Sequence, residues 1–262
     1  MNQNLPAQSK DVIFPGFKGW IYLCLICSFL FTSCARYYYA PNSVNIPLLD
    51  EKEAKINAQY LAGGLSDGVE CQSAFAITSH FGGMVNMMVN GGNDEDLFYE
   101  TEAKTNMSFI EIGGGYFTPI KSTALIFETY AGVGTGGVRN DYDPGNSTVR
   151  FTKLFIQPNI GVKNKYIEFG ISSRMSWTKH RVMTPAPQES SYFYELDDIK
   201  NNPVSIFWEP GVVLRAGGNK FKVQLQYTAS VNLSHPEDAL TQEEGYFAFG
   251  FTIPIHYTTT AQ

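Results

Sequence analysis

Apolar and polar residues alternate along most of the chain after residue 52, and this pattern constrains the fold more than any other feature. In one such segment Ile167, Phe169 and Ile171 alternate with Glu168 and Gly170. A period of two is typical of a β-strand whose two faces meet different surroundings. Ten segments of this kind follow one another, most of them about 9 to 14 residues long, and none has a convincing helical period. The sequence therefore predicts an all-β, ten-stranded antiparallel up-and-down β-barrel.

The lengths of the segments and of their connections favour a transmembrane barrel. Ordinary strands average about five or six residues, whereas a membrane-spanning strand needs about 9 to 11. Connections in outer-membrane barrels are short on the periplasmic side and longer on the extracellular side. The short connections are 80–82, 117–121, 163–165 and 217–219, and the moderate or long ones are 63–68, 91–105, 134–148, 181–203 and 234–243. This alternation predicts short periplasmic turns, long extracellular loops and both ends of the barrel on the short-turn side.

Charges on the polar faces of the expected strands balance, with four acidic and four basic residues. They are Glu111, Glu128, Glu168, Glu209, Lys153, Arg174, Arg215 and Lys222. Because an unpaired buried charge is strongly destabilising, a narrow lumen needs such ion pairs. We therefore expect a packed polar lumen and an apolar face turned toward lipid. The alternative is a soluble, lipid-anchored barrel whose apolar lumen binds a hydrophobic ligand.

The residues ahead of the barrel have the order of a secretory signal. Lys10 and Lys18 precede an apolar run at 20–31, and small residues follow up to Cys34. A run of about a dozen residues is too short to span the membrane as a helix. We expect a lipoprotein signal peptide at 1–33, an acylated tether at 34–51 and the barrel domain at 52–262. The tether has no clean period, which suggests an extended segment or one tucked against the barrel.

The F-T-S-C sequence at 31–34 resembles a bacterial lipobox, in which the cysteine becomes the first mature residue and carries acyl chains such as palmitate. Phe31 stands where Leu is usual, and an ordinary signal peptide that leaves Cys34 a plain thiol is the alternative. With L-F-I-Q-P-N-I-G at 154–161 and W-E-P-G-V-V-L-R-A-G at 208–217, the chain resembles the small outer-membrane β-barrel lipoproteins of Bacteroidota-type bacteria. Those families are largely without assigned activity, so the resemblance implies a fold and a place in the cell outer membrane. No acidic residues follow Cys34 directly, which implies an anchor, and hence an N-terminus, on the periplasmic side.

Candidate catalytic and metal-binding patterns are weak. Gly132, Gly134 and Gly137 match a dinucleotide-binding spacing, but no helix follows to cradle a phosphate, so we expect the end of a strand and a polar loop. A rim protease or lipid-modifying enzyme would use His180 or His235. A ten-stranded barrel resembles the omptin surface proteases, yet neither histidine stands in the strand-end Asp-His spacing that this family shows. The neighbours of His235, Ser234 and Glu237, complete only a sequence-adjacent triad.

Asp141, Asp143 and Asn146 form the best candidate for Ca²⁺, although the set lacks a bidentate glutamate and a solvated acidic rim is the preferred interpretation. The net charge of −6 argues against a nucleic-acid role. We therefore expect no cofactor, contact with outer-membrane lipid, and a non-enzymatic structural or interaction role in which acidic loops face a surface partner. A small-solute channel or transporter is the alternative. The sequence does not indicate the oligomeric state.

Overall fold

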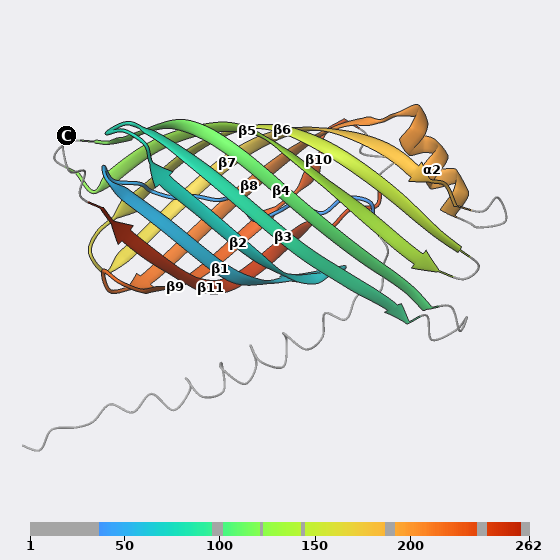
Figure 1. Cartoon of the computed structure of the whole chain (residues 1–262), viewed down its shortest axis with the longest axis horizontal. Helices are drawn as coiled ribbons and strands as arrows, with labels where there is room; N and C mark the ends of the chain where they lie inside the picture. Colours follow the sequence, from blue (N-terminus) through green and yellow to red (C-terminus); the bar gives the residue numbers. More distant parts are fainter. Residues whose placement is uncertain are drawn as a thin grey trace, which may run out of the picture. The chain divides into compact units, whose positions relative to one another are not determined.

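The computed structural model describes residues 37–95, 102–120, 123–142, 145–186, 192–234 and 240–257. The strands are β1 (Glu53–Gly63), β2 (Asp67–Ala76), β3 (Phe81–Glu95), β4 (Glu102–Pro119), β5 (Leu125–Tyr142), β6 (Gly145–Lys163), β7 (Ile167–Thr184), β8 (Val204–Gly217), β9 (Lys222–Ala229), β10 (Val231–Asn232) and β11 (Gly245–His256). Among the described residues, the helix α2 (Tyr192–Asn201) lies between β7 and β8 (Figure 1).

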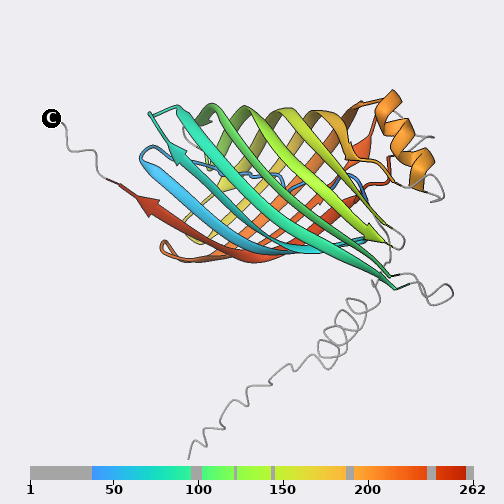
Figure 2. The same cartoon turned by 45° about the vertical axis from the view of Figure 1, so that its right-hand side comes forward.

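The strands close into an antiparallel barrel (Figure 2). Each strand from β1 to β8 pairs with the next one, β8 pairs with β9, β9 with β11, and β11 with β1. The two-residue β10 continues β9 beyond Ser230 and pairs with β8. Ten long strands thus form the wall, and the predicted all-β, ten-stranded up-and-down barrel is confirmed.

The apolar faces of the strands point outward. Neighbouring strands bring Ile112, Val133, Leu154 and Trp177 side by side in one register row, and all four are exposed. Because successive side chains of a strand point to opposite faces, the polar residues between them point inward. The predicted apolar exterior is therefore observed, and the alternative with an apolar lumen is wrong.

Several strands are longer than the sequence predicts. β5 and β6 stay paired up to Tyr142 and Gly145, so the loop expected at 134–148 is mostly strand. β3 and β4 similarly pair as far as Glu95 and Glu102. Glycines and polar residues hide the alternation there, whereas the ladder of backbone hydrogen bonds needs no particular side chains. The glycine motif of 132–137 therefore lies within β5, and the expected strand end there is wrong.

The helix α2 was not expected from the sequence, which predicts only a loop at 181–203. Leu196 and Ile199 are its buried side chains, and both belong to the hydrophobic cluster at this end of the barrel. Two buried apolar positions three residues apart are too few to reveal a helical period in a helix of ten residues. Within the described ranges no helix is long and apolar enough to cross a membrane.

Candidate functional site: a lumen filled by the N-terminal segment

The lumen of the barrel is filled by part of the chain itself. Residues 37–49, which we call the plug, run inside the ring of strands in both views (Figures 1 and 2). Every residue of the plug is buried. The sequence left open whether this segment is free or tucked against the barrel, and the structure places it within the lumen.

Side chains of the barrel wall make hydrogen bonds with the plug backbone, as the backbone of a neighbouring strand would in a sheet. Gln157 Nε2 donates to the carbonyl of Asn45 over 2.6 Å, and Gln72 Nε2 donates to the carbonyl of Ser43 over 2.9 Å. The backbone N–H of Val44 donates to the Thr228 hydroxyl over 3.1 Å. Buried backbone groups must find partners, and these polar side chains provide them. The plug is therefore bound by the wall and does not merely fill space.

The plug runs between the two ends of the barrel. It starts at the end that carries the β7–β8 and β9–β11 connections, which we call the long-connection end, and finishes at the end that carries the β6–β7 and β8–β9 turns, the short-turn end. At its start, the Tyr38 N–H donates to the Thr241 carbonyl over 2.8 Å, and the Glu243 N–H donates to the Tyr39 carbonyl over 2.9 Å. Residues 241 and 243 belong to the connection between β9 and β11 at the long-connection end. At its finish, Lys163 Nζ donates to the Leu48 carbonyl over 3.1 Å, close to the short turn between β6 and β7. The described part of the tether, from residue 37 onward, therefore begins at the long-connection end.

Four charged residues in the middle of the lumen form one network, which we call the central cluster. Arg174 Nε lies 2.8 Å from Glu209 Oε2, and Arg174 Nη1 lies 3.3 Å from Glu111 Oε1. Lys153 Nζ lies 3.4 Å from Glu111 Oε2. Asn42 of the plug accepts from Lys153 Nζ over 2.7 Å and donates to Glu111 Oε1 over 2.8 Å. Two positive and two negative charges from β4, β6, β7 and β8 thus balance around one plug side chain.

A second network, which we call the mouth cluster, lies nearer the short turns. Lys55, Arg215 and Lys222 all contact the carboxylate of Glu168, at 2.8, 3.1 and 2.8 Å. Three cations on one carboxylate need further acceptors, and the plug supplies three of them, one being the Leu48 carbonyl, 3.1 Å from Lys55 Nζ. Lys55 Nζ donates to the Pro47 carbonyl over 2.7 Å, and Arg215 Nη2 donates to the Ile46 carbonyl over 2.9 Å. Plug carbonyls therefore complete the solvation of the lumen cations.

Glu128 differs from the other seven residues that the sequence singled out for the lumen. All eight are buried inside the barrel, but within the described part of the chain no cationic side chain pairs with Glu128. Its carboxylate accepts the backbone N–H groups of Leu48 and Leu49 over 3.1 and 2.8 Å, and Asn159 Nδ2 donates to it over 3.2 Å. The partner of Glu128 is therefore the end of the plug, which an ion-pair interpretation of the sequence misses.

Glu128→Gln should loosen the finish of the plug. Hydrogen bonds to a charged group are worth about 1.5 to 3 kcal/mol each, and a neutral amide keeps only part of that strength. We expect the free energy of unfolding to fall by about 1 to 2 kcal/mol, measured by urea titration of the folded protein. Asp141→Asn is the control, because Asp141 is an exposed carboxylate on the same barrel wall. An equal effect of both substitutions would contradict the role given to Glu128.

The rim at the long-connection end is held by another buried carboxylate. Glu243 accepts the backbone N–H groups of Gly64, Leu65 and Ser66 over 3.0, 2.7 and 3.0 Å, which ties the β1–β2 turn to the β9–β11 connection. Burial raises the pKa of Glu243, although these hydrogen bonds oppose the shift. The rim therefore closes around the start of the plug.

Two of the three residues suggested for calcium lie in the described part of the chain, on neighbouring strands. Asp141 lies at the end of β5, where its Oδ1 is 2.9 Å from Nε of Arg139. Asn146 is its register partner on β6, and Asp143 lies outside the described residues. Within the described ranges no group of three or more His, Cys, Asp or Glu side chains is placed to hold a metal ion.

Of the residues suggested for rim catalysis, His180 lies among aromatic side chains and Ser234 makes hydrogen bonds to β10 and to β8. His180 is buried on β7, with its ring 6.1 Å from that of Tyr39 and 6.0 Å from that of Phe151. Its Nε2 has no hydrogen-bond partner among the described residues. Ser234 Oγ donates to Asn232 and accepts the Ile206 N–H. His235, Glu237 and Cys34 lie outside the described residues.

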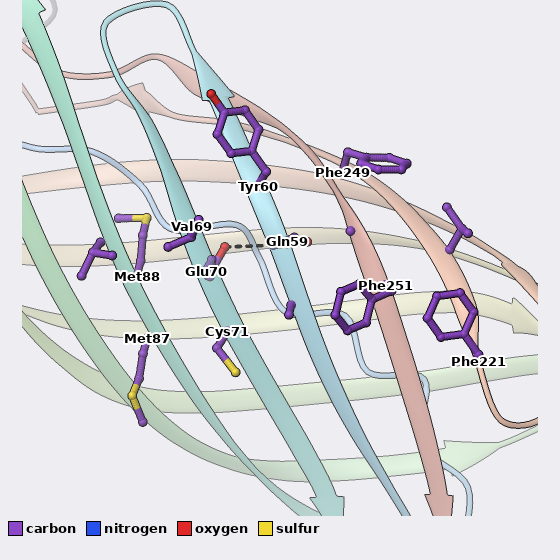
Figure 3. Close-up of a pocket in the computed structure, with 14 residues that line it drawn as sticks. Gln59, Tyr60, Val69, Glu70, Cys71, Met87, Met88, Phe221, Phe249 and Phe251 are labelled. Carbon is purple, nitrogen blue, oxygen red and sulfur yellow. Dashed lines mark hydrogen bonds between the residues drawn. The ribbon is translucent and has the colours of Figure 1, made fainter.

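An apolar groove of about 770 Å³ lies on the outer wall, across β9, β11, β1, β2 and β3 (Figure 3). The large side chains of Phe251 and Met87 stand on either side of Cys71 in this view. Ala58, the register partner of Cys71, also lines the groove. Cys71 is a free, exposed cysteine. The groove belongs to the apolar exterior and is separate from the plugged lumen.

Lumen residues missing from the sequence interpretation fall into two kinds. Lys55 lies on the polar face of β1 together with Asn57 and Gln59, so its alternation could have revealed it. Asn42 and the plug carbonyls had no such signal, because the plug has no period and contains Pro41 and Pro47. The sequence can therefore predict the wall residues of the site, but not the plug residues that fill it.

Comparison of the sequence with protein-family models and with curated proteins gives no match. Among solved structures, the chain is similar to the transport unit of the autotransporter AIDA-I from Escherichia coli, with 10% identity and a TM-score of 0.38. The alignment covers 82% of this chain and 93% of that one. The assignment of a ten-stranded barrel comes from the hydrogen-bonded pairing of the strands themselves.

Proposed function

We propose that this protein is a barrel embedded in the bacterial outer membrane, closed by its own plug, with a structural or interaction role and no catalytic one. The observation that carries the proposal is the buried plug, whose backbone is bound by wall side chains from several strands. A solute would have to displace both the plug and the two charge networks to pass. The acidic helix α2, with the exposed residues Asp197 and Asp198, offers a surface for a partner at the long-connection end.

A test of this proposal is the conductance of the purified protein in planar lipid bilayers. We expect wild-type protein to insert and remain silent, with no discrete current steps. Insertion is checked separately by the slower migration of boiled protein on a gel, which is typical of folded outer-membrane barrels. Stable unitary currents from correctly folded protein would contradict the closed lumen and support the channel alternative.

Leu154→Arg should distinguish a membrane barrel from a water-soluble one. Leu154 is exposed in the outward apolar row, and a cation near the membrane midplane on a lipid-facing strand costs about 2 to 4 kcal/mol. We expect that loss of unfolding free energy for protein in lipid vesicles. Thr184→Arg is the control, because Thr184 is an exposed residue at the last position of β7. Equal, small effects at both positions would argue against membrane embedding.

A further inference from the structure

We infer that the chain ahead of the plug leaves the barrel beside the long connections, so that acyl chains on Cys34 enter the membrane leaflet on that side. Outer-membrane barrels place their long loops outside the cell. The anchor would then lie in the outer leaflet, while both ends of the barrel strands face the periplasm. This inference rests on the proposed membrane-embedded barrel, and it reverses the side implied by the residues after Cys34.

The first step is the fixed direction of the plug. Its start is held at the long-connection end, where Tyr39 stacks on Phe207 with ring centroids 4.3 Å apart and pairs in parallel with Gln242. Asn140 Nδ2 donates to the Tyr37 carbonyl over 3.2 Å, so the backbone is bound up to its first described residue. The finish lies at Glu128 near the short turns, as described above.

The second step is the distance that the plug covers. From 37 to 49 the chain makes twelve steps, which reach up to about 40 Å when extended. The apolar band of an outer-membrane barrel is only about 25 Å tall. An extended plug with its two ends at opposite rims therefore crosses the whole thickness of the membrane inside the barrel.

The third step is the short reach of the chain ahead of the plug. Cys34 precedes Tyr37 by three residues, and three steps between Cα atoms cover at most about 11 Å. That length cannot return to the short-turn rim on the far side of the membrane. The only lipid within reach of acyl chains on Cys34 is the leaflet at the long-connection end.

Site-specific proteolysis tests the side of the anchor. A protease recognition sequence flanked by Gly and Ser is inserted between Ala35 and Arg36, and cells are grown with radiolabelled palmitate. Protease added to intact cells should remove the label from the barrel band and leave a heat-shifting barrel. The matched control carries the same insertion after Gln262, beyond the end of β11, and should be cut only after lysis.

Two outcomes would overturn the inference. Label that survives protease on intact cells but is lost after lysis would put the anchor on the periplasmic side. Absence of palmitate from a folded barrel, with or without Cys34, would remove the anchor itself. Either result leaves the closed membrane barrel standing, because heat shift and silent conductance are measured independently of the anchor.

A disulfide in the Cys71→Ser background tests the threading directly. A Cβ built on Gly211 would lie 3.0 Å from Cβ of Val44, close to the spacing of about 3.5 to 4.5 Å in disulfides. Val44→Cys with Gly211→Cys should form a bond whose reduction changes gel mobility. Val44→Cys with Gly161→Cys is the control and should not, because Gly161 lies against Leu48. No bond in the first pair would show that the plug is not threaded as inferred.

Discussion

Arg174→Met should destabilise the barrel more than any other single substitution in the lumen wall, by about 3 to 5 kcal/mol. The guanidinium is fully buried and contacts both Glu111 and Glu209, and it also donates to the carbonyl of Asn42 over 2.9 Å. Methionine fills similar space without charge, so Lys153 would be left alone with two buried carboxylates. Chemical unfolding of vesicle-embedded protein, followed by tryptophan fluorescence, measures the loss.

Two companion variants make this prediction specific. Arg174→Met combined with Glu209→Gln removes one charge of each sign and should recover a large part of the loss. Arg139→Met is the matched control, because its ion pair with Asp141 is exposed, with side chains 60% and 41% accessible. Such surface pairs contribute about 0 to 1 kcal/mol. A similar loss in the Arg174 and Arg139 variants would mean that the central cluster has no special role.

Replacing residues 37–49 by a Gly-Ser segment of equal length should convert the silent barrel into a conducting one. The replacement removes the side chains that fill the lumen, including Asn42 from the central cluster. Eight-stranded barrels are filled by their own wall side chains, whereas a wall of ten strands that accommodates a whole peptide segment leaves a lumen for water without it. Planar-bilayer recordings should then show discrete current steps that are absent in wild-type protein.

The control for this replacement is a Gly-Ser substitution of residues 258–262, which follow β11 and leave the plug intact. It should remain silent and keep its heat-dependent gel shift. If the barrel with the replaced plug folds, shows the heat shift and still passes no current, wall side chains alone close the lumen. In that case the plug would have an anchoring role and no role as a barrier.

The barrel was predictable from the sequence because the alternation of apolar and polar side chains is local and repeats from strand to strand. Alternation in stretches such as 167–177 reports directly which side chains face outward and which face the lumen. The same alternation singled out Glu111, Arg174 and Glu209 on inward faces, where the structure joins them. Balanced charge on that face was itself a signal, since a buried lumen tolerates charge only in compensated sets.

The plug and the helix α2 were not predictable, for two different reasons. The plug is a single extended segment enclosed by the wall on every side, with apolar neighbours such as Phe207 and Val213 as well as polar ones, so no two-faced pattern arises along it. Its partners, such as Gln157 and Thr228, are distant in sequence and meet it only after the barrel closes. The helix has two buried anchors, Leu196 and Ile199, and one spacing of three residues does not establish a helical period.

The threaded plug also makes the molecule resemble a rotaxane, in which an axle passes through a ring and is stopped at both ends. The ring is closed where β1 meets β11, so residues synthesised first must already be in place when the last strand docks. Chain segments rarely thread through closed structures in proteins, which makes the order of assembly a strong constraint. With its covalent link to β1 as one stop and the proposed acyl chains on Cys34 as the other, the plug can leave only if the ring opens. The lifetime of the plugged barrel is then set by the rate at which the ring of strands opens, and the free energy of unfolding alone does not determine it.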